Sequence, residues 1–111
     1  MSAGVTGSHA QLASALRTRV EETGTLEPTL RKGILARGAG GPAVPDPYDA
    51  LAHQVAEDSY RVTDAQVRAI VEEAGSEGNA FEVLLTAAIG AGLRRWDAAA
   101  KAIGDAEDAT S

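Results

Sequence analysis

Three side chains of the types that perform acid–base chemistry lie close together in the middle of the chain. His53, Glu57 and Tyr60 are spaced i, i+4 and i+7, which on an α-helix places them within an arc of about 60°. A histidine beside a carboxylate can act as a general base near neutral pH, and a phenol can donate a hydrogen bond to a developing oxyanion. The spacing fits three interpretations, namely a solvated helix face, a polar contact between subunits and a catalytic site.

A helix must run through these residues to bring them onto one face. The pair Asp46-Pro47 supplies an N-cap with proline at the first helical position, and it predicts a helix that runs to about Arg61. The apolar face on its opposite side comprises Tyr48, Leu51 and Val55. Thr63 to Gln66 then has the T-x-x-Q form of a capping box, which predicts a further helix that ends at Gly75.

The last helix is expected to be the longest, from Ser76, a good N-cap residue, to Gly104. Its apolar residues recur at the helical period, at Phe81, Leu85, Ala88, Gly92, Trp96, Ala99 and Ile103. The segment Val83–Leu93 is apolar almost all round, so it is predicted to be buried on every side. Eleven residues are too few to cross a bilayer, and three short helices are too few to cover this segment. The sequence therefore predicts a homo-oligomer. Gly90 and Gly92 each cost about 1 kcal/mol relative to alanine inside a helix, so another backbone is expected to approach closely there.

The N-terminal part is predicted to hold two shorter helices, from Ser8 to about Thr23 and from about Pro28 to Gly38. A Gly/Pro-rich linker follows the second of them. The fold class is accordingly all-α, with about five helices organised around one long buried C-terminal helix. Three segments are expected, namely an N-terminal helical arm with its linker (1–45), a compact core (46–104) and an acidic disordered tail (105–111). Residues 1–7 are also expected to be disordered.

Composition excludes several classes of function. The chain has no cysteine, and its two histidines, His9 and His53, are far apart in the sequence, so neither a metal site nor a cofactor is expected. A net charge of −6 argues against binding to nucleic acid. Residues 1–7 lack the features of a signal peptide, and no membrane segment is expected, so the predicted location is the cytoplasm.

Residues 46–103 resemble the carboxymuconolactone decarboxylase and alkylhydroperoxidase D-like (AhpD-like) superfamily. The matching text is Val-Thr-Asp at 62–64, Val-Arg-Ala-Ile-Val-Glu-Glu-Ala-Gly at 67–75, Phe-Glu-Val at 81–83 and Ala-Ala-Ile-Gly-Ala-Gly at 87–92. The resemblance implies an AhpD-like helical core and an oligomer with active sites at or near subunit contacts. The peroxidase branch of the family carries C-x-x-C followed four residues later by His, and these positions fall on Tyr60, Thr63 and Val67 of this chain.

This departure from the family pattern excludes thiol peroxidase chemistry. Tyr60 and Thr63 cannot form a disulfide, and Val67 cannot relay protons. The free N–H groups at the helix start could still hold an oxyanion. The candidate catalytic residues are therefore His53 as base, Glu57 as its orienting partner, Tyr60 as hydrogen-bond donor and Thr63 at the helix start.

Two functional hypotheses follow. The first is a cofactor-free lyase, isomerase or decarboxylase that transfers protons on a small organic acid or carbonyl compound. The alternative is a non-catalytic binding or assembly subunit for a partner enzyme. They differ in whether His53, Glu57 and Tyr60 line a closed pocket or an open surface. A catalytic site requires that Tyr60 be shielded and lie near both His53 and the start of the helix at Thr63.

Overall fold

The computed structural model describes the backbone of residues 2–110 and the side chains of residues 10–109. Within that range it contains α-helices and one 3₁₀ turn and no strand, which confirms the all-α prediction. The elements are α1 (Ser2–Glu22), α2 (Pro28–Gly38), α3 (Tyr48–Asp58), the 3₁₀ turn η1 (Ser59–Arg61), α4 (Asp64–Ala74) and α5 (Glu77–Thr110). Met1, Ser111 and the expected capping side chain of Ser8 lie outside the described part.

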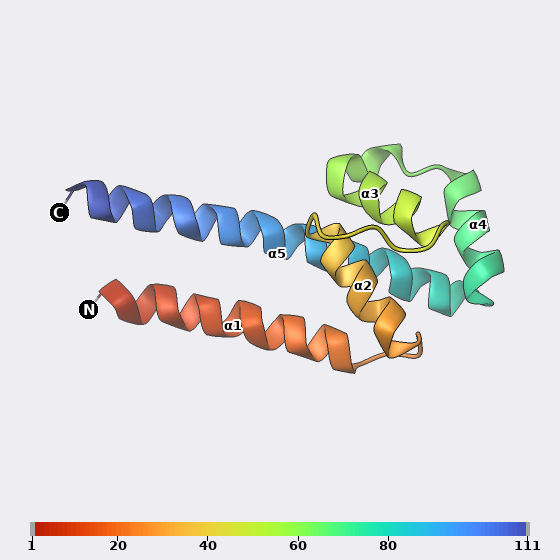
Figure 1. The fold of residues 1–111 in the computed structure, drawn as a ribbon, viewed down its shortest axis with the longest axis horizontal. Helices are drawn as coiled ribbons and strands as arrows, with labels where there is room; N and C mark the ends of the chain where they lie inside the picture. Colours follow the sequence, from red (N-terminus) through yellow and green to blue (C-terminus); the bar gives the residue numbers. More distant parts are fainter. Residues whose placement is uncertain (1, 111) are drawn as a thin grey trace.

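The molecule is elongated, with extents of 54 × 27 × 20 Å. Helices α2, α3 and α4 pack around the first half of α5 at one end (Figure 1). Helix α1 and the second half of α5 extend away from this end in opposite chain directions, so that both termini lie at the far end of the molecule (Figure 1). An ion pair of 3.3 Å between Arg17 Nη2 and Asp97 Oδ2 links these two helices.

Nearby residues explain where α2, α4 and α5 start and where α4 ends. The carboxylate of Glu27 accepts the backbone N–H groups of Thr29 and Leu30 at the start of α2, where Pro28 occupies the first turn. Thr63 and Gln66 form the predicted capping box of α4. Gly75 ends α4 with a φ of +89°, a conformation that glycine adopts without strain. Before α5, the hydroxyl of Ser76 accepts the N–H of Asn79, as expected for an N-cap.

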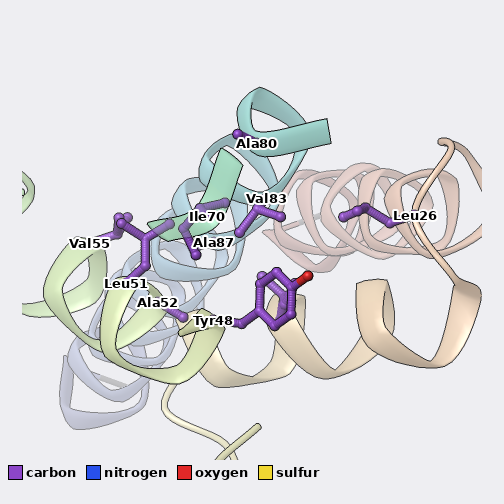
Figure 2. Packing of buried hydrophobic residues seen from close by; sticks show 10 residues of the cluster. Leu26, Tyr48, Leu51, Ala52, Val55, Ile70, Ala80, Val83 and Ala87 are labelled. Atoms are coloured by element: carbon purple, nitrogen blue, oxygen red, sulfur yellow. The ribbon is translucent and has the colours of Figure 1, made fainter. Parts of the chain in front are cut away.

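The hydrophobic core lies where α2, α3, α4 and α5 meet. The predicted apolar face of α3 is buried, and Leu51 and Ala52 are completely enclosed. In Figure 2, side chains of α3 gather beside Ile70 of α4 and Ala87 of α5. The cluster consists of Leu26, Ile34, Tyr48, Leu51, Ala52, Val55, Ile70, Ala80, Val83 and Ala87.

Helices α2 and α5 make the most extensive contact, and two glycines allow it. A Cβ on Gly38 of α2 would collide with the carbonyl oxygen of Ala87 on α5, and a Cβ on Gly90 of α5 would collide with that of Leu35 on α2. The two backbones therefore touch directly, which confirms the predicted close approach at Gly90. Ile34 of α2 belongs to the same hydrophobic cluster as residues of α3, α4 and α5, so residues of the expected arm (1–45) pack against those of the expected core (46–104).

The turn between α1 and α2 is held by α5. The Glu82 carboxylate accepts the backbone N–H of Thr25 at 2.7 Å and that of Leu26 at 2.8 Å. From the other side, the buried guanidinium of Arg31 donates to the carbonyl oxygens of Glu21, Gly24 and Leu26. These bonds satisfy backbone groups that a short turn would otherwise leave unpaired.

Three sequence-based expectations about the ends and the cover of the helices are wrong. Helix α1 begins at Ser2 instead of Ser8, and α5 continues to Thr110, so the segment expected to be a disordered tail (105–111) is helical through that residue. A helix once nucleated gains a hydrogen bond with each residue added, so an existing helix can extend through residues of modest helix propensity. Helix α5 is also not buried on every side, because only one of its faces packs on the core.

Candidate functional site

The predicted catalytic residues lie on an open surface. His53 and Glu57 of α3 are exposed, and the Tyr60 side chain is 98% exposed. Thr63 is also exposed, and its hydroxyl accepts the N–H of Gln66 at 3.1 Å as the cap of α4. The shielding expected of Tyr60 under the catalytic hypothesis is thus not found in this chain.

A change of direction after Asp58 separates Tyr60 from the α3 face. Asp58 is the last residue of α3, and η1 follows it directly. The Asp58 carboxylate accepts the backbone N–H of Tyr60 at 3.1 Å, which fixes the start of the 3₁₀ turn. Because the α-helix does not reach Tyr60, the i, i+7 relation to His53 that placed them on one arc does not apply.

The residues beside His53 come from α2 and from α3 itself. Its Nδ1 lies 3.5 Å from Nη2 of Arg37, and Arg37 Nε donates to Asp49 Oδ1 at 2.8 Å. The N–H of Val44 donates to the same oxygen at 3.0 Å. The Val44 N–H and then the Arg37 guanidinium hold the pKa of the Asp49 carboxyl below its usual value. This ion pair fixes the linker between α2 and α3 against both helices.

Sequence reasoning missed Arg37 and Asp49. Asp49 stands four residues before His53, a spacing that could have identified it as a neighbour on α3. Arg37 is 16 residues from His53 and carries no local signal of this contact. Both ion-pair partners are occupied by each other and by the backbone, so their arrangement is that of a structural tether.

The hollows described in the structure lie away from these residues. A pocket of about 390 Å³ opens between α1, α2 and α5, with both charged and small apolar residues in its wall. It is lined by Arg17, Glu21, Lys32, Leu35, Ala36, Ala39, Gly40, Gly41, Gly90 and Leu93. A smaller one of about 160 Å³ lies over Gly38, Ala56, Ala91, Arg94, Arg95 and Ala98. Neither includes a predicted catalytic residue.

An apolar surface follows the outer side of α5, and we call it the α5 stripe. It consists of Phe81, Leu85, Ala88, Gly92, Trp96, Ala99 and Ile103, all exposed. Its large members keep much of their surface in solvent, with exposed fractions of 66% for Phe81, 47% for Leu85, 41% for Trp96 and 57% for Ile103. The sequence predicted a long buried helix with this set at the helical period, but the period marks an apolar face without showing what covers it.

The α5 stripe is free of charged side chains. At 100° per residue its seven members fall within an arc of about 80°, opposite the buried residues Ala80, Val83 and Ala87. Arg95 lies just outside this arc, and its Nη2 donates to the carbonyl oxygen of Ala56 on α3 at 3.1 Å. The stripe therefore forms a continuous apolar ridge along most of α5.

Other kinds of site receive no support from the described residues. Among them there is no group of three or more His, Asp or Glu side chains placed to hold a metal ion. In the same part of the chain no helix is both long enough and apolar enough to cross a membrane.

Comparison of the chain with protein-family models, with curated proteins and with solved structures gave no match. The resemblance of residues 46–103 to the AhpD-like superfamily therefore stays a prediction from the sequence.

Proposed function

We propose that this chain is a non-catalytic assembly subunit that binds another α-helix through the α5 stripe. One observation carries the proposal: a charge-free apolar face is exposed along α5, on the side opposite the residues that pack on the core in the first half of this helix. Exposed apolar surfaces of this continuity mark interaction sites in folded proteins. An amphipathic helix can pack against such a face in the manner of helix pairs.

The exposed area is large enough to drive association. Taking roughly 150–250 Å² for a whole aromatic side chain and somewhat less for Leu or Ile, the four large members of the stripe expose about 400 Å². Burial at about 25 cal/mol per Å² would gain about 10 kcal/mol from this chain alone. The surface of the partner adds to this, against an association cost of about 4–15 kcal/mol.

The hypothesis of proton-transfer catalysis is less well supported. A general base and an oxyanion donor act most strongly in a site that excludes water, whereas His53, Glu57 and Tyr60 face solvent. A catalytic site on this face would require a second chain to cover it. Membership of the AhpD-like superfamily and a cytoplasmic location are further parts of the proposal, and both rest on the sequence.

The chain's single tryptophan, Trp96, lies in the stripe and allows a direct test. The protein at 1 µM is titrated with a synthetic amphipathic helix that carries leucine at every third or fourth position. We expect a saturable blue shift of the tryptophan emission, because docking removes water from the indole. Leu85→Glu should weaken binding at least tenfold, since a carboxylate would enter the apolar contact.

Ala65→Glu is the matched control, because Ala65 is exposed on α4 and gains the same charge away from the stripe. Its titration should coincide with that of the unmodified chain. If the emission responds neither to the peptide nor to protein concentration up to 100 µM, the stripe is not a docking face and the proposal is wrong.

A further inference from the structure

We infer that the α5 stripe pairs with the α5 stripe of a second copy of this chain, antiparallel, about a two-fold axis at Gly92. The inference rests on the proposed function and specifies the partner that the stripe binds.

The positions of the stripe are symmetric about Gly92. Phe81 and Ile103 each lie eleven residues from it, Leu85 and Ala99 seven, and Ala88 and Trp96 four. Eleven residues are close to three whole turns, so the stripe follows a nearly straight line along the helix. In an antiparallel pair centred on Gly92, each residue before it faces the residue equally far after it on the other copy.

This arrangement places large side chains against small ones. Trp96 of one copy faces Ala88 of the other, and Leu85 faces Ala99. At the ends of the stripe Phe81 faces Ile103. Helices that cross at an angle are farther apart there than at the crossing point, so two large side chains fit between them. A parallel pair in register would instead place Trp96 against Trp96 and Ala88 against Ala88. The two indoles would then be too large for the space between the helices, and the two alanines would leave a gap. The size sequence of the stripe thus favours the antiparallel pair.

Gly92 gives an independent reason for a partner at this point. A glycine inside a helix makes the helix less stable than an alanine would. Position 90 requires glycine, because a Cβ there would collide with the carbonyl oxygen of Leu35. A Cβ on Gly92 would meet no atom of its own chain within 4 Å. Packing within one copy therefore does not explain this glycine, whereas close approach of a second helix at the two-fold axis does.

The surrounding charges and the area are compatible with a dimer. Arg17 of α1 binds Asp97, which lies on the side of α5 away from the stripe. Antiparallel helices also align their dipoles favourably. The four large stripe residues of two copies together expose about 800 Å², twice the value for one chain, and Ala88, Gly92 and Ala99 add to this, which brings the area near the roughly 1,000 Å² of a small specific interface.

Cysteine cross-linking can test the geometry because the natural chain has no cysteine. Leu85→Cys and Ala99→Cys are prepared separately in the full chain, and disulfide-linked dimer is measured after mild oxidation at 50 µM. We expect the mixture of the two variants to give at least fivefold more dimer than either variant alone. Ala65→Cys on α4 measures cross-linking by random collision.

Other results would overturn the inference. Efficient cross-linking of Ala99→Cys with itself indicates a parallel pair, and yields no higher than those of Ala65→Cys indicate no pair. A second variant, Gly92→Leu, should lower the dimer association constant at least tenfold in sedimentation equilibrium, while the melting temperature at 1 µM does not fall, because leucine is a better helix former than glycine. If the chain remains monomeric yet the amphipathic peptide still shifts the Trp96 emission, the inference fails and the proposed function stands.

Discussion

Gly90 and Gly92 are two residues apart in α5, and replacing each by alanine should change stability in opposite directions. A Cβ on Gly92 has no neighbour within 4 Å in the same chain. Alanine is favoured over glycine inside a helix by about 0.8–1.0 kcal/mol. Gly92→Ala should therefore raise the free energy of unfolding of the monomer by about 0.5–1 kcal/mol.

Gly90→Ala adds the same atom where the backbone of α2 already touches α5. The new Cβ would collide with the Leu35 carbonyl oxygen and lie 3.2 Å from the Ala39 nitrogen. These two backbone atoms form a hydrogen bond at the end of α2, so no flexible side chain can move aside. Overpacking of this kind costs about 1–3 kcal/mol, which exceeds the gain in helix propensity and leaves a net loss of about 1 kcal/mol or more.

Urea unfolding followed by far-ultraviolet circular dichroism measures both variants, at 1 µM protein so that association contributes little. For a domain of this size, 1 kcal/mol corresponds to a change in melting temperature of about 4–8 °C. The two variants carry the same substitution two residues apart in the same helix, so each is the control for the other. Equal shifts, or destabilisation by Gly92→Ala alone, would refute the contact between α2 and α5 described above.

Three further substitutions test other parts of the structure. Arg31 is 3% exposed and donates three hydrogen bonds to carbonyl oxygens of the turn, which Arg31→Met removes. Calorimetry should show that the free energy of unfolding falls by about 2–4 kcal/mol, and an unchanged melting temperature would contradict this role of Arg31. Because the folded-state pKa of Asp49 is lowered from the usual 3.8, its ionised form stabilises the fold above that pH, and this contribution is lost as the pH falls through the folded-state pKa. Asp49→Asn should therefore unfold at a lower urea concentration than the natural chain at pH 7, and this difference should shrink as the pH is lowered below 3.8. Coincident midpoints at pH 7 would show that the carboxylate contributes nothing. Tyr60→Phe should change the free energy of unfolding by less than about 0.5 kcal/mol, since the ring is 98% exposed, and a larger loss would mean that the hydroxyl is buried in solution.

The start and the end of α4 could be predicted because they depend on residues within a few positions of each other. The hydroxyl of Thr63 and the side chain of Gln66 satisfy each other's backbone groups, and Gly75 stops α4 through its own conformation. The apolar face of α3 could be predicted for a similar reason, since polar residues on its other side leave one face to bury.

The cover of α5 could not be predicted, because both of its faces are apolar. Which face meets the core is decided by tertiary contacts, above all the backbone approach between Gly38 and Ala87, and no local pattern reveals it. The placement of the candidate catalytic residues could not be predicted for a related reason. A shared arc of His53 and Tyr60 required α3 to continue past Asp58, but the Asp58 carboxylate accepts the N–H of Tyr60 and starts a 3₁₀ turn there.

The bonds from Glu82 to Thr25 and Leu26 have a consequence for synthesis on the ribosome. They join residues 56 or more positions apart, so the turn between α1 and α2 has no acceptor until α5 has been made. At about 5–20 residues per second, the ribosome needs about 3–11 s to add those residues. During these seconds Ile34 and Leu35, both buried in the finished protein, have no α5 to pack against. The nascent chain then exposes these two apolar side chains of α2, and transiently exposed apolar surface makes a chain prone to aggregation.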